Sequence, residues 1–163
     1  MDASHDIATV TEHERQLVFP RFDEETAFRI GSAIRGNALA RRAPITIEVR
    51  LWDRPLFFAA LPGSVASNVD WMRRKFNVVK MFNKSTYRMV LEEQSPDRQF
   101  KVGWGLPITE YVLAGGGFPI TVEGAGVIGA FLVSGLPERE DHEAIVAVLS
   151  AELGVEGMGL PPL

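Results

Sequence analysis

The sequence predicts a single α/β domain in which helices cover an antiparallel sheet. Its 163 residues fit one domain of ordinary size. Two segments, 45–61 and 118–134, each have the pattern of two strands joined by a turn, and hairpins force antiparallel pairing. The stretches around them carry apolar residues at helical spacing, and helices beside such a sheet must cover at least one of its faces.

The chain divides into three parts. Residues 1–20 form an N-terminal lead-in that is polar except for the short apolar stretch Leu17-Val18-Phe19. We expect this stretch to pack on the domain or on a neighbouring subunit. Residues 21–154 form the folded domain. Residues 155–163, which are rich in Gly and Pro, form a flexible tail.

The first helix of the domain is expected between Asp23 and Pro44. Asp23 is a typical N-cap residue, and Pro44 stops the helix. Residues 45–51 then alternate between apolar and polar side chains, as a half-buried strand does. A turn over 52–55 leads into a second strand over 56–61, which completes the first hairpin.

Three helices are expected between the two hairpins. The first covers about 67–82, and the next follows a cap at Ser85 or Thr86. A polar loop over 94–106 precedes a short helix over 107–114, which leads into three glycines.

The second hairpin and one more helix complete the domain. Strands over 118–122 and 127–134 flank a turn that contains two glycines. Pro137 suits the first position of a helix over 138–153, and Gly154 is a natural C-terminal cap.

Composition argues against several function classes. The net charge is −4, whereas a general nucleic-acid binder carries a basic excess. The absence of cysteine excludes disulfides, thiolate metal sites and cysteine nucleophiles. No apolar run reaches the roughly 18 residues of a membrane span. The acidic, polar N-terminus also lacks the pattern of a secretory signal. We therefore expect a cytoplasmic protein with no membrane or nucleic-acid partner.

The most unusual local feature is the run Gly115-Gly116-Gly117, which is followed by Phe118. Consecutive glycines allow positive φ angles and close backbone approach, so the loop could present N–H groups to an anion or a flat ligand. The alternative is a tight turn into an edge strand. No Gly-Lys-Ser/Thr sequence follows, so the loop is not a nucleotide P-loop.

Basic and aromatic side chains could add ligand contacts. Arg74 and Lys75 lie on a basic helix that is either a solvated face or a clamp for a carboxylate. Phe82 or Phe118 could stack on a flat ring.

The three histidines predict no metal site. His5 and His13 lie in the lead-in without a second ligand at a familiar spacing. His142 falls three residues before Ile145 of a buried stripe, which favours a capping or packing role over a ligand role.

No catalytic constellation is recognisable in the sequence. The serines do not lie in a nucleophile-elbow pattern, and the acidic residues show no paired-carboxylate signature. The catalytic residues are therefore unknown, and the question whether the chain is an enzyme stays open.

Seven segments together resemble a known family. They are 17–22 (LVFPRF), 60–63 (ALPG), 68–75 (NVDWMRRK), 115–120 (GGGFPI), 126–129 (GVIG), 133–137 (VSGLP) and 141–143 (DHE). In this order they resemble the haem-degrading HbpS-like (GlcG/HbpS-like) family, in its UPF0303-like cytosolic branch. The resemblance covers about residues 7–153.

The resemblance implies a profilin-like fold, with the sheet between helices, and multimeric assembly. Relatives include haem-binding and haem-degrading sensor proteins and corrinoid-associated modules, so haem is the implied cofactor. In that branch a His commonly precedes the glycines, where this chain has Ala114, and a Ser is usual at the position of Gly117.

Two functional hypotheses follow. The first is a binding module for haem or another flat anionic small molecule, with or without weak haem-degrading activity. From the family fold, its site lies between the glycine loop and two helices, with His142 as the axial ligand. The predicted binding residues are Arg74, Lys75, Phe82, Gly115, Gly116, Gly117, Phe118 and His142. The second is a non-enzymatic oligomeric scaffold or protein-interaction factor. We expect a homo-oligomer in both cases.

Overall fold

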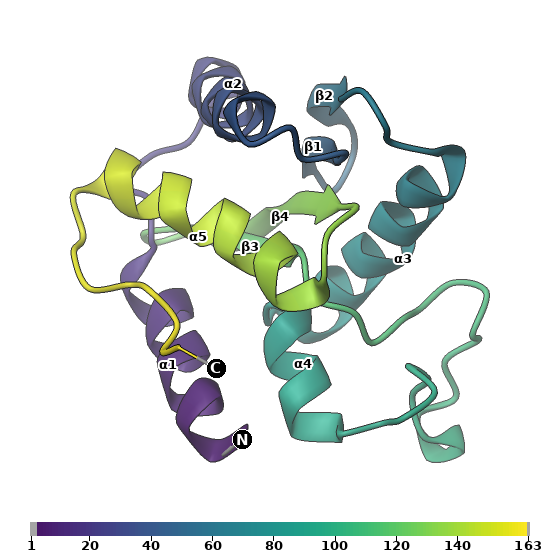
Figure 1. Ribbon diagram of the computed structural model, residues 1–163. Coiled ribbons are helices and arrows are strands. Elements are labelled where there is room, and N and C mark those ends of the chain that lie inside the picture. The colour runs from purple at the N-terminus through teal and green to yellow at the C-terminus, as the bar shows by residue number, and fades with distance from the viewer. Residues whose placement is uncertain (1–2, 163) are drawn as a thin grey trace.

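Four antiparallel strands lie between helices in the computed structural model, which describes residues 3–162 (Figure 1). The elements in chain order are α1 (Ala3–Gln16), α2 (Glu24–Ala40), β1 (Thr46–Leu51), β2 (Pro55–Ala60), α3 (Ala66–Phe82), α4 (Thr86–Glu93), the 3-10 turn η1 (Val102–Trp104), β3 (Gly117–Val122), β4 (Gly126–Ser134) and α5 (Glu138–Leu153).

The sheet consists of two hairpins joined at its centre. Its strand order is β2-β1-β4-β3, and every neighbouring pair is antiparallel. The central pair β1–β4 runs in register from Thr46 opposite Ser134 to Leu51 opposite Gly129. The predicted antiparallel sheet with two hairpins is therefore confirmed.

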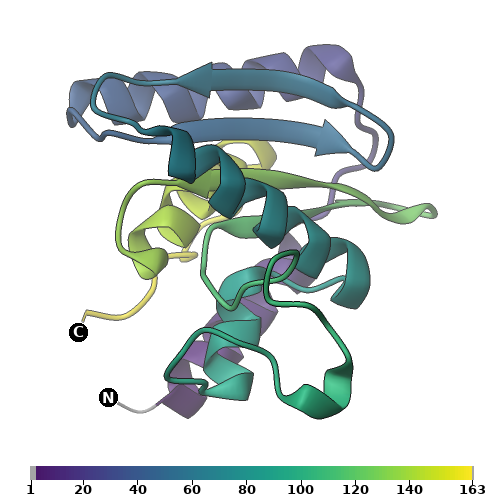
Figure 2. The same cartoon turned by 90° about the vertical axis from the view of Figure 1, so that its right-hand side faces the viewer.

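Helices cover both faces of the sheet. On one face, α2 and α5 pack over Ile47, Val49, Phe131 and Val133, all of which are fully buried. On the other face, α3 crosses the strands (Figure 2). There Met72, Phe76 and Val79 of α3 pack on Ala130 and Leu132 of β4. Neighbouring residues of a strand point to opposite faces of the sheet. The strands therefore contribute side chains to two cores, one on each face.

The lead-in predicted over residues 1–20 contains a helix that the sequence pattern did not predict. Helix α1 packs beside α4. It places Val10 and His13 in the interior, and Asp6 is also buried. This buried side mixes apolar and polar residues, so no apolar stripe reveals it.

The apolar stretch after α1 packs on its own domain, which was one of the two expectations. Leu17 and Phe19 are buried in the core beneath α2 and α5. The Phe19 amide donates to the Thr121 carbonyl at 2.8 Å, and the Glu123 amide donates to the Phe19 carbonyl at 2.9 Å. This segment therefore lies along β3 and fastens α1 to the sheet.

Two local expectations were wrong. Residues 107–114 form a turn followed by a segment without regular secondary structure, not a helix. After the turn the Leu113 amide donates to the Arg98 carbonyl at 2.9 Å, which pairs this segment with the preceding loop. Pro137 is the residue before α5, not its first helical residue, with ψ of 140°.

The predicted caps at Asp23 and Gly154 are present, and Ser85 caps α4. The Asp23 carboxylate accepts from the Thr26 amide, and the Ser85 hydroxyl accepts from the Arg88 amide. Gly154 ends α5 in the left-handed conformation that glycine favours.

The C-terminal segment 155–162 contains no helix or strand. Val155 and Met158 nevertheless pack against the core, and the Pro161 carbonyl accepts from the Arg139 guanidinium. Within the described residues, the chain has no helix of the length and apolar character that a bilayer span requires.

Candidate functional site

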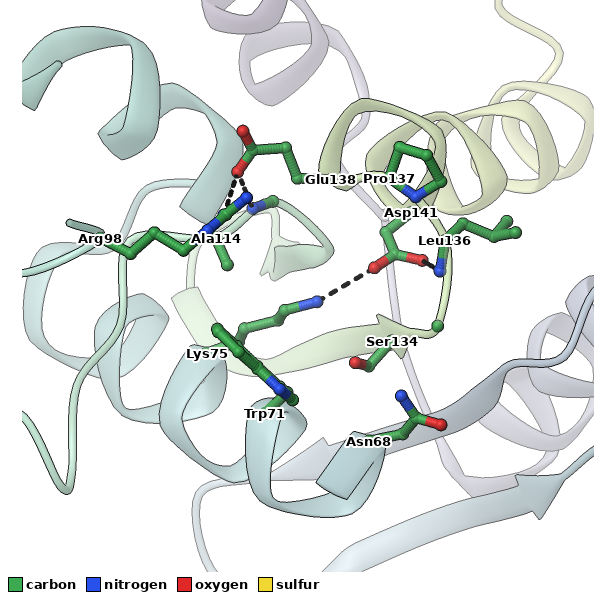
Figure 3. Close-up of a pocket in the computed structure, with 12 residues that line it drawn as sticks. Asn68, Trp71, Lys75, Arg98, Ala114, Ser134, Leu136, Pro137, Glu138 and Asp141 are labelled. Atoms are coloured by element: carbon green, nitrogen blue, oxygen red, sulfur yellow. Dashed lines mark hydrogen bonds and ion pairs between the residues drawn. The ribbon is translucent and has the colours of Figure 1, made fainter. Parts of the chain in front are cut away.

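A pocket of about 300 Å³ opens where the start of α3, the glycine segment and the start of α5 meet (Figure 3). This volume is at the lower end of the range for small-molecule sites, roughly 300–1,000 Å³. The described residues that line it are Asn68, Trp71, Lys75, Arg98, Ala114, Gly115, Ser134, Gly135, Leu136, Pro137, Glu138 and Asp141. These lining residues come from four separate stretches of the chain.

A buried ion pair lies at one side of the pocket. Lys75 Nζ donates to Asp141 Oδ2 at 3.2 Å and to the Val133 carbonyl at 2.8 Å. Both charged side chains are only 3% exposed. Asp141 Oδ1 accepts from the Leu136 amide at 3.0 Å. An ammonium has three N–H donors, so these two described acceptors leave one donor for a ligand.

Burial shifts both members of the pair toward their neutral forms. It raises the pKa of Asp141 to about 6 and lowers the pKa of Lys75, while the charge of each partner opposes the shift of the other. Because the pKa of Asp141 stays below 7, its carboxyl group is charged at neutral pH, and this carboxylate favours the ammonium form of Lys75. The pocket therefore contains a cation and an anion that are shielded from solvent.

A second ion pair lies at the pocket on the side of the long loop. Arg98 donates to Glu138 Oε2 at 2.9 Å, and the Gly115 amide approaches the same oxygen at 3.4 Å. No side chain caps the N-terminus of α5, which also borders the pocket. The first turn of α5 carries three acidic side chains, Glu138, Glu140 and Asp141, which offset the positive end of this helix.

The glycines allow the loop to lie against Lys75 and α5. A Cβ atom on Gly115 would meet the Glu138 carbonyl. A Cβ on Gly116, whose φ is +112°, would meet the Val133 carbonyl and lie 2.8 Å from Lys75 Nζ. Gly115 lines the pocket, and Gly117 begins the edge strand β3, as the turn alternative expected.

We expect the Gly116→Ala variant to lose about 2–5 kcal/mol of stability, because it combines a positive φ with a backbone collision. Gly124→Ala is a matched control, since Gly124 has φ of +76° and open space around it. It should lose only about 1–2 kcal/mol. Urea unfolding of both variants measures this difference, and equal losses would show that the close approach is unimportant.

Arg74 does not line the pocket but contacts one of its walls. Its guanidinium lies over the Trp71 ring, 4.5 Å from the centroid, and pairs with Asp70 at 3.0 Å.

The two predicted stacking residues lie away from the pocket. Phe118 is fully buried in the core of the sheet. Phe82 stacks on Phe100, with ring centroids 5.3 Å apart, and meets the edge of Trp104. The aromatic ring that lines the pocket is Trp71, which the sequence pattern did not single out.

His142 faces the interior on the side of α1. It is fully buried, and its Nε2 lies 3.1 Å from Nδ1 of His13, which is also fully buried. Burial lowers the pKa of His142 to about 3 and also lowers the pKa of His13. Both rings are therefore neutral and share one N–H···N hydrogen bond. His142 does not line the pocket.

The fold and the pocket together define a helix-covered antiparallel sheet with one buried cation beside a small-molecule-sized cavity. A family model described as "Haem degrading protein HbpS-like" matches residues 22–150. The chain therefore belongs to the HbpS-like family, and the resemblance seen in the sequence is confirmed.

Known relatives support this assignment. The chain is 61% identical over 160 residues to a UPF0303 protein of Mesorhizobium japonicum, covering 98% of this chain and 96% of the relative. It is 48% identical over 159 residues to a UPF0303 protein of Brucella anthropi, covering 98% and 94%.

Solved structures share the fold. The Ybr137w protein matches with a TM-score of 0.83 and 24% identity over 91% of this chain and 87% of that one. HbpS matches at 0.63 and 19% identity over 82% and 91%. A PduOC:heme complex matches at 0.64 and 15% identity over 82% and 95%. These identities support the fold alone.

The lining residues do not fit a haem iron. Proteins hold haem iron through His, Cys, Met or Tyr side chains. None of these residue types is among the described residues that line the pocket. In the described part of the chain, no cluster of three or more His, Asp or Glu side chains could hold a metal ion.

Proposed function

We propose that the chain is a binding module for a small anionic molecule that occupies the Lys75 pocket. The observation that carries this proposal is a buried ammonium group with one N–H donor free to meet a ligand. A carboxylate or phosphate accepts from such a donor through a charge-assisted hydrogen bond.

The Trp71 ring in the pocket lining favours a flat ligand. Trp71 offers an aromatic ring on which a flat ligand can stack. The Arg74 guanidinium packs on this ring and restricts its motion. The small volume suits a single ring with one anionic group better than a porphyrin. We accordingly propose recognition of the anionic group by Lys75 and of the ring by Trp71.

Haem is the second candidate, because the family description and the structurally similar PduOC:heme complex both point to it. The lining residues supply no axial donor of the usual kinds. If haem binds, we expect contacts through its propionates, and a His142→Ala variant that binds as tightly as the wild type.

Calorimetric titration with 4-(hydroxymethyl)benzoate, together with haem titration followed in the visible spectrum, tests the proposal. Lys75→Met should weaken binding of the benzoate about 10- to 100-fold, the value of one charged hydrogen bond. Lys80→Met is a matched control, because Lys80 is exposed on the same helix. The double variant Lys75→Met/Asp141→Leu removes both buried charges and separates lost binding from lost folding.

Binding that is unchanged in Lys75→Met would contradict the proposal. If neither the benzoate nor haem binds to the wild type, the non-enzymatic scaffold hypothesis takes its place.

We also propose that the chain forms a homo-oligomer. Strand β2 is an edge of the sheet, carries no charged residue and exposes 51% of Phe58. Phe28 of α2, which packs against β2, is 61% exposed. Uncharged, apolar sheet edges invite pairing with another chain.

Light scattering at micromolar concentration should give a mass that is a multiple of 18.0 kDa. Phe58→Glu should shift the mass toward the monomer, whereas Val102→Glu, another exposed apolar position, should leave it unchanged. A monomeric wild type would contradict the proposal.

A further inference from the structure

We propose that the Lys75 amine forms a reversible imine with a small molecule that carries both a carbonyl and an anionic group. This inference rests on the proposed function, because it assigns a substrate class to the same pocket. The first observation concerns the nucleophilic side chains that line the pocket. Among the described lining residues these are the Lys75 amine and the Ser134 hydroxyl.

The surroundings of Lys75 favour an amine that can react. Its side chain is 3% exposed, and desolvation of the ammonium lowers its pKa. An amine that loses its proton readily is a better nucleophile than a solvated ammonium. A surface lysine, such as Lys80 on the same helix, lacks this environment.

Asp141 is placed to carry the proton that this reaction moves. Its Oδ2 lies 3.2 Å from Lys75 Nζ, within reach for direct transfer. Burial raises its pKa to about 6, so the carboxyl group can both accept and return a proton near neutral pH. The Leu136 amide holds the other oxygen at 3.0 Å and fixes the orientation of the carboxylate.

The reaction balances without an oxidant or a further reactant. The Lys75 ammonium gives a proton to Asp141, and the amine lone pair attacks the carbonyl carbon to form a C–N bond. The carbonyl oxygen takes the proton back from Asp141, which gives a carbinolamine. Asp141 then takes a second proton from the nitrogen and gives it to the hydroxyl group, and the freed nitrogen lone pair expels this group as water. The product is a protonated imine, which keeps the positive charge beside Asp141.

Reductive trapping in the full-length wild-type chain tests the inference. The probe is 4-carboxybenzaldehyde, which combines a flat ring, a carboxylate and an aldehyde, and cyanoborohydride makes the imine permanent. The chain has four lysines, at positions 75, 80, 84 and 101, so the other three are internal controls. Peptide mass mapping at short times should find Lys75 modified at least about tenfold faster than each of them, because the pocket concentrates the aldehyde at the amine.

Two further results complete the test. Excess 4-(hydroxymethyl)benzoate should protect Lys75, because it occupies the pocket but cannot form an imine. Asp141→Asn should slow the modification of Lys75 about 100-fold, the size of a general acid–base contribution. Modification of Lys75 no faster than that of the exposed lysines would overturn the inference.

The outcomes distinguish this inference from the proposed function. If the benzoate binds and depends on Lys75 but the aldehyde is not trapped there, only the imine is contradicted. If the benzoate does not bind at all, the proposed function fails as well.

Discussion

Acid should destabilise His142→Phe much less than the wild type. Between pH 7 and pH 5 the wild type should lose about 2 kcal/mol more of its free energy of unfolding than the variant does. In the folded chain burial lowers the pKa of His142 to about 3. In the unfolded chain it titrates at about 6.5. The unfolded state therefore binds more protons between these values, and stability falls as the pH is lowered through 6.5 toward 3.

At pH 7 the variant should be the less stable protein, because His13 Nδ1 loses its partner in the interior. At pH 5 this deficit should shrink by about 2 kcal/mol, since the wild type then bears the cost of a neutral His142. Urea unfolding of both proteins at the two pH values measures the change in the deficit.

The comparison between variants is necessary because another buried group acts in the opposite direction. The pKa of Asp141 is raised to about 6, so its protonation favours the folded state between about 6 and 3.8. His5→Phe is the control, because His5 is exposed on α1. If His142→Phe is less stable than the wild type by the same amount at pH 7 and at pH 5, the conclusion that the buried histidine pair is neutral is wrong.

The second large effect concerns the Lys75–Asp141 pair. Lys75→Met should cost about 3–5 kcal/mol of stability, because it leaves the Asp141 carboxylate buried without its cation. The double variant Lys75→Met/Asp141→Leu should recover most of this loss, since apolar side chains of similar size often replace a buried pair without cost.

Arg73→Met provides the matched control on the same helix. Arg73 pairs with Asp70 and Glu110, but all three side chains are nearly half exposed. Exposed pairs contribute only about 0–1 kcal/mol. If the double variant is as unstable as the sum of its single variants, the two charges do not act as a pair.

The sheet could be predicted from the sequence because its first strand alternates between apolar and polar residues and two segments have the pattern of hairpins. Ile45, Ile47 and Val49 of this strand lie in the core beneath α2 and α5, which is the pattern that the pleat requires. Helix α1 could not be predicted in this way. Its buried side contains His13 and Asp6, which only tertiary contacts with α4 and α5 satisfy.

The pocket was predictable only in part. Lys75 and the glycines were expected near one another from the family resemblance, and the structure brings them into contact. The partner Asp141 was missed because it lies 66 positions along the chain from Lys75. One local signal was present, since Lys75 immediately precedes Phe76 and lies three residues after Met72, in a buried stripe. A lysine in such a stripe predicts a buried anion.

Phe82 and Phe118 were wrongly expected at the pocket for a similar reason, because contacts between distant parts of the chain decide where they lie. Phe82 and Phe118 have the chemistry to stack on a ligand, but packing uses both rings elsewhere. Phe82 meets Phe100 of the long loop, and no sequence spacing predicts that contact. His142, which the family resemblance offered as an axial ligand, instead lies against His13 of α1.

A crystal structure of the chain soaked with 4-(hydroxymethyl)benzoate tests the central claim most directly. We predict density for the benzoate between Trp71 and Lys75, with its carboxylate within hydrogen-bond distance of Nζ. Clear density in the apolar pocket between α2 and α5, near Ile34 and Ala144, with the Lys75 pocket empty, would contradict the claim.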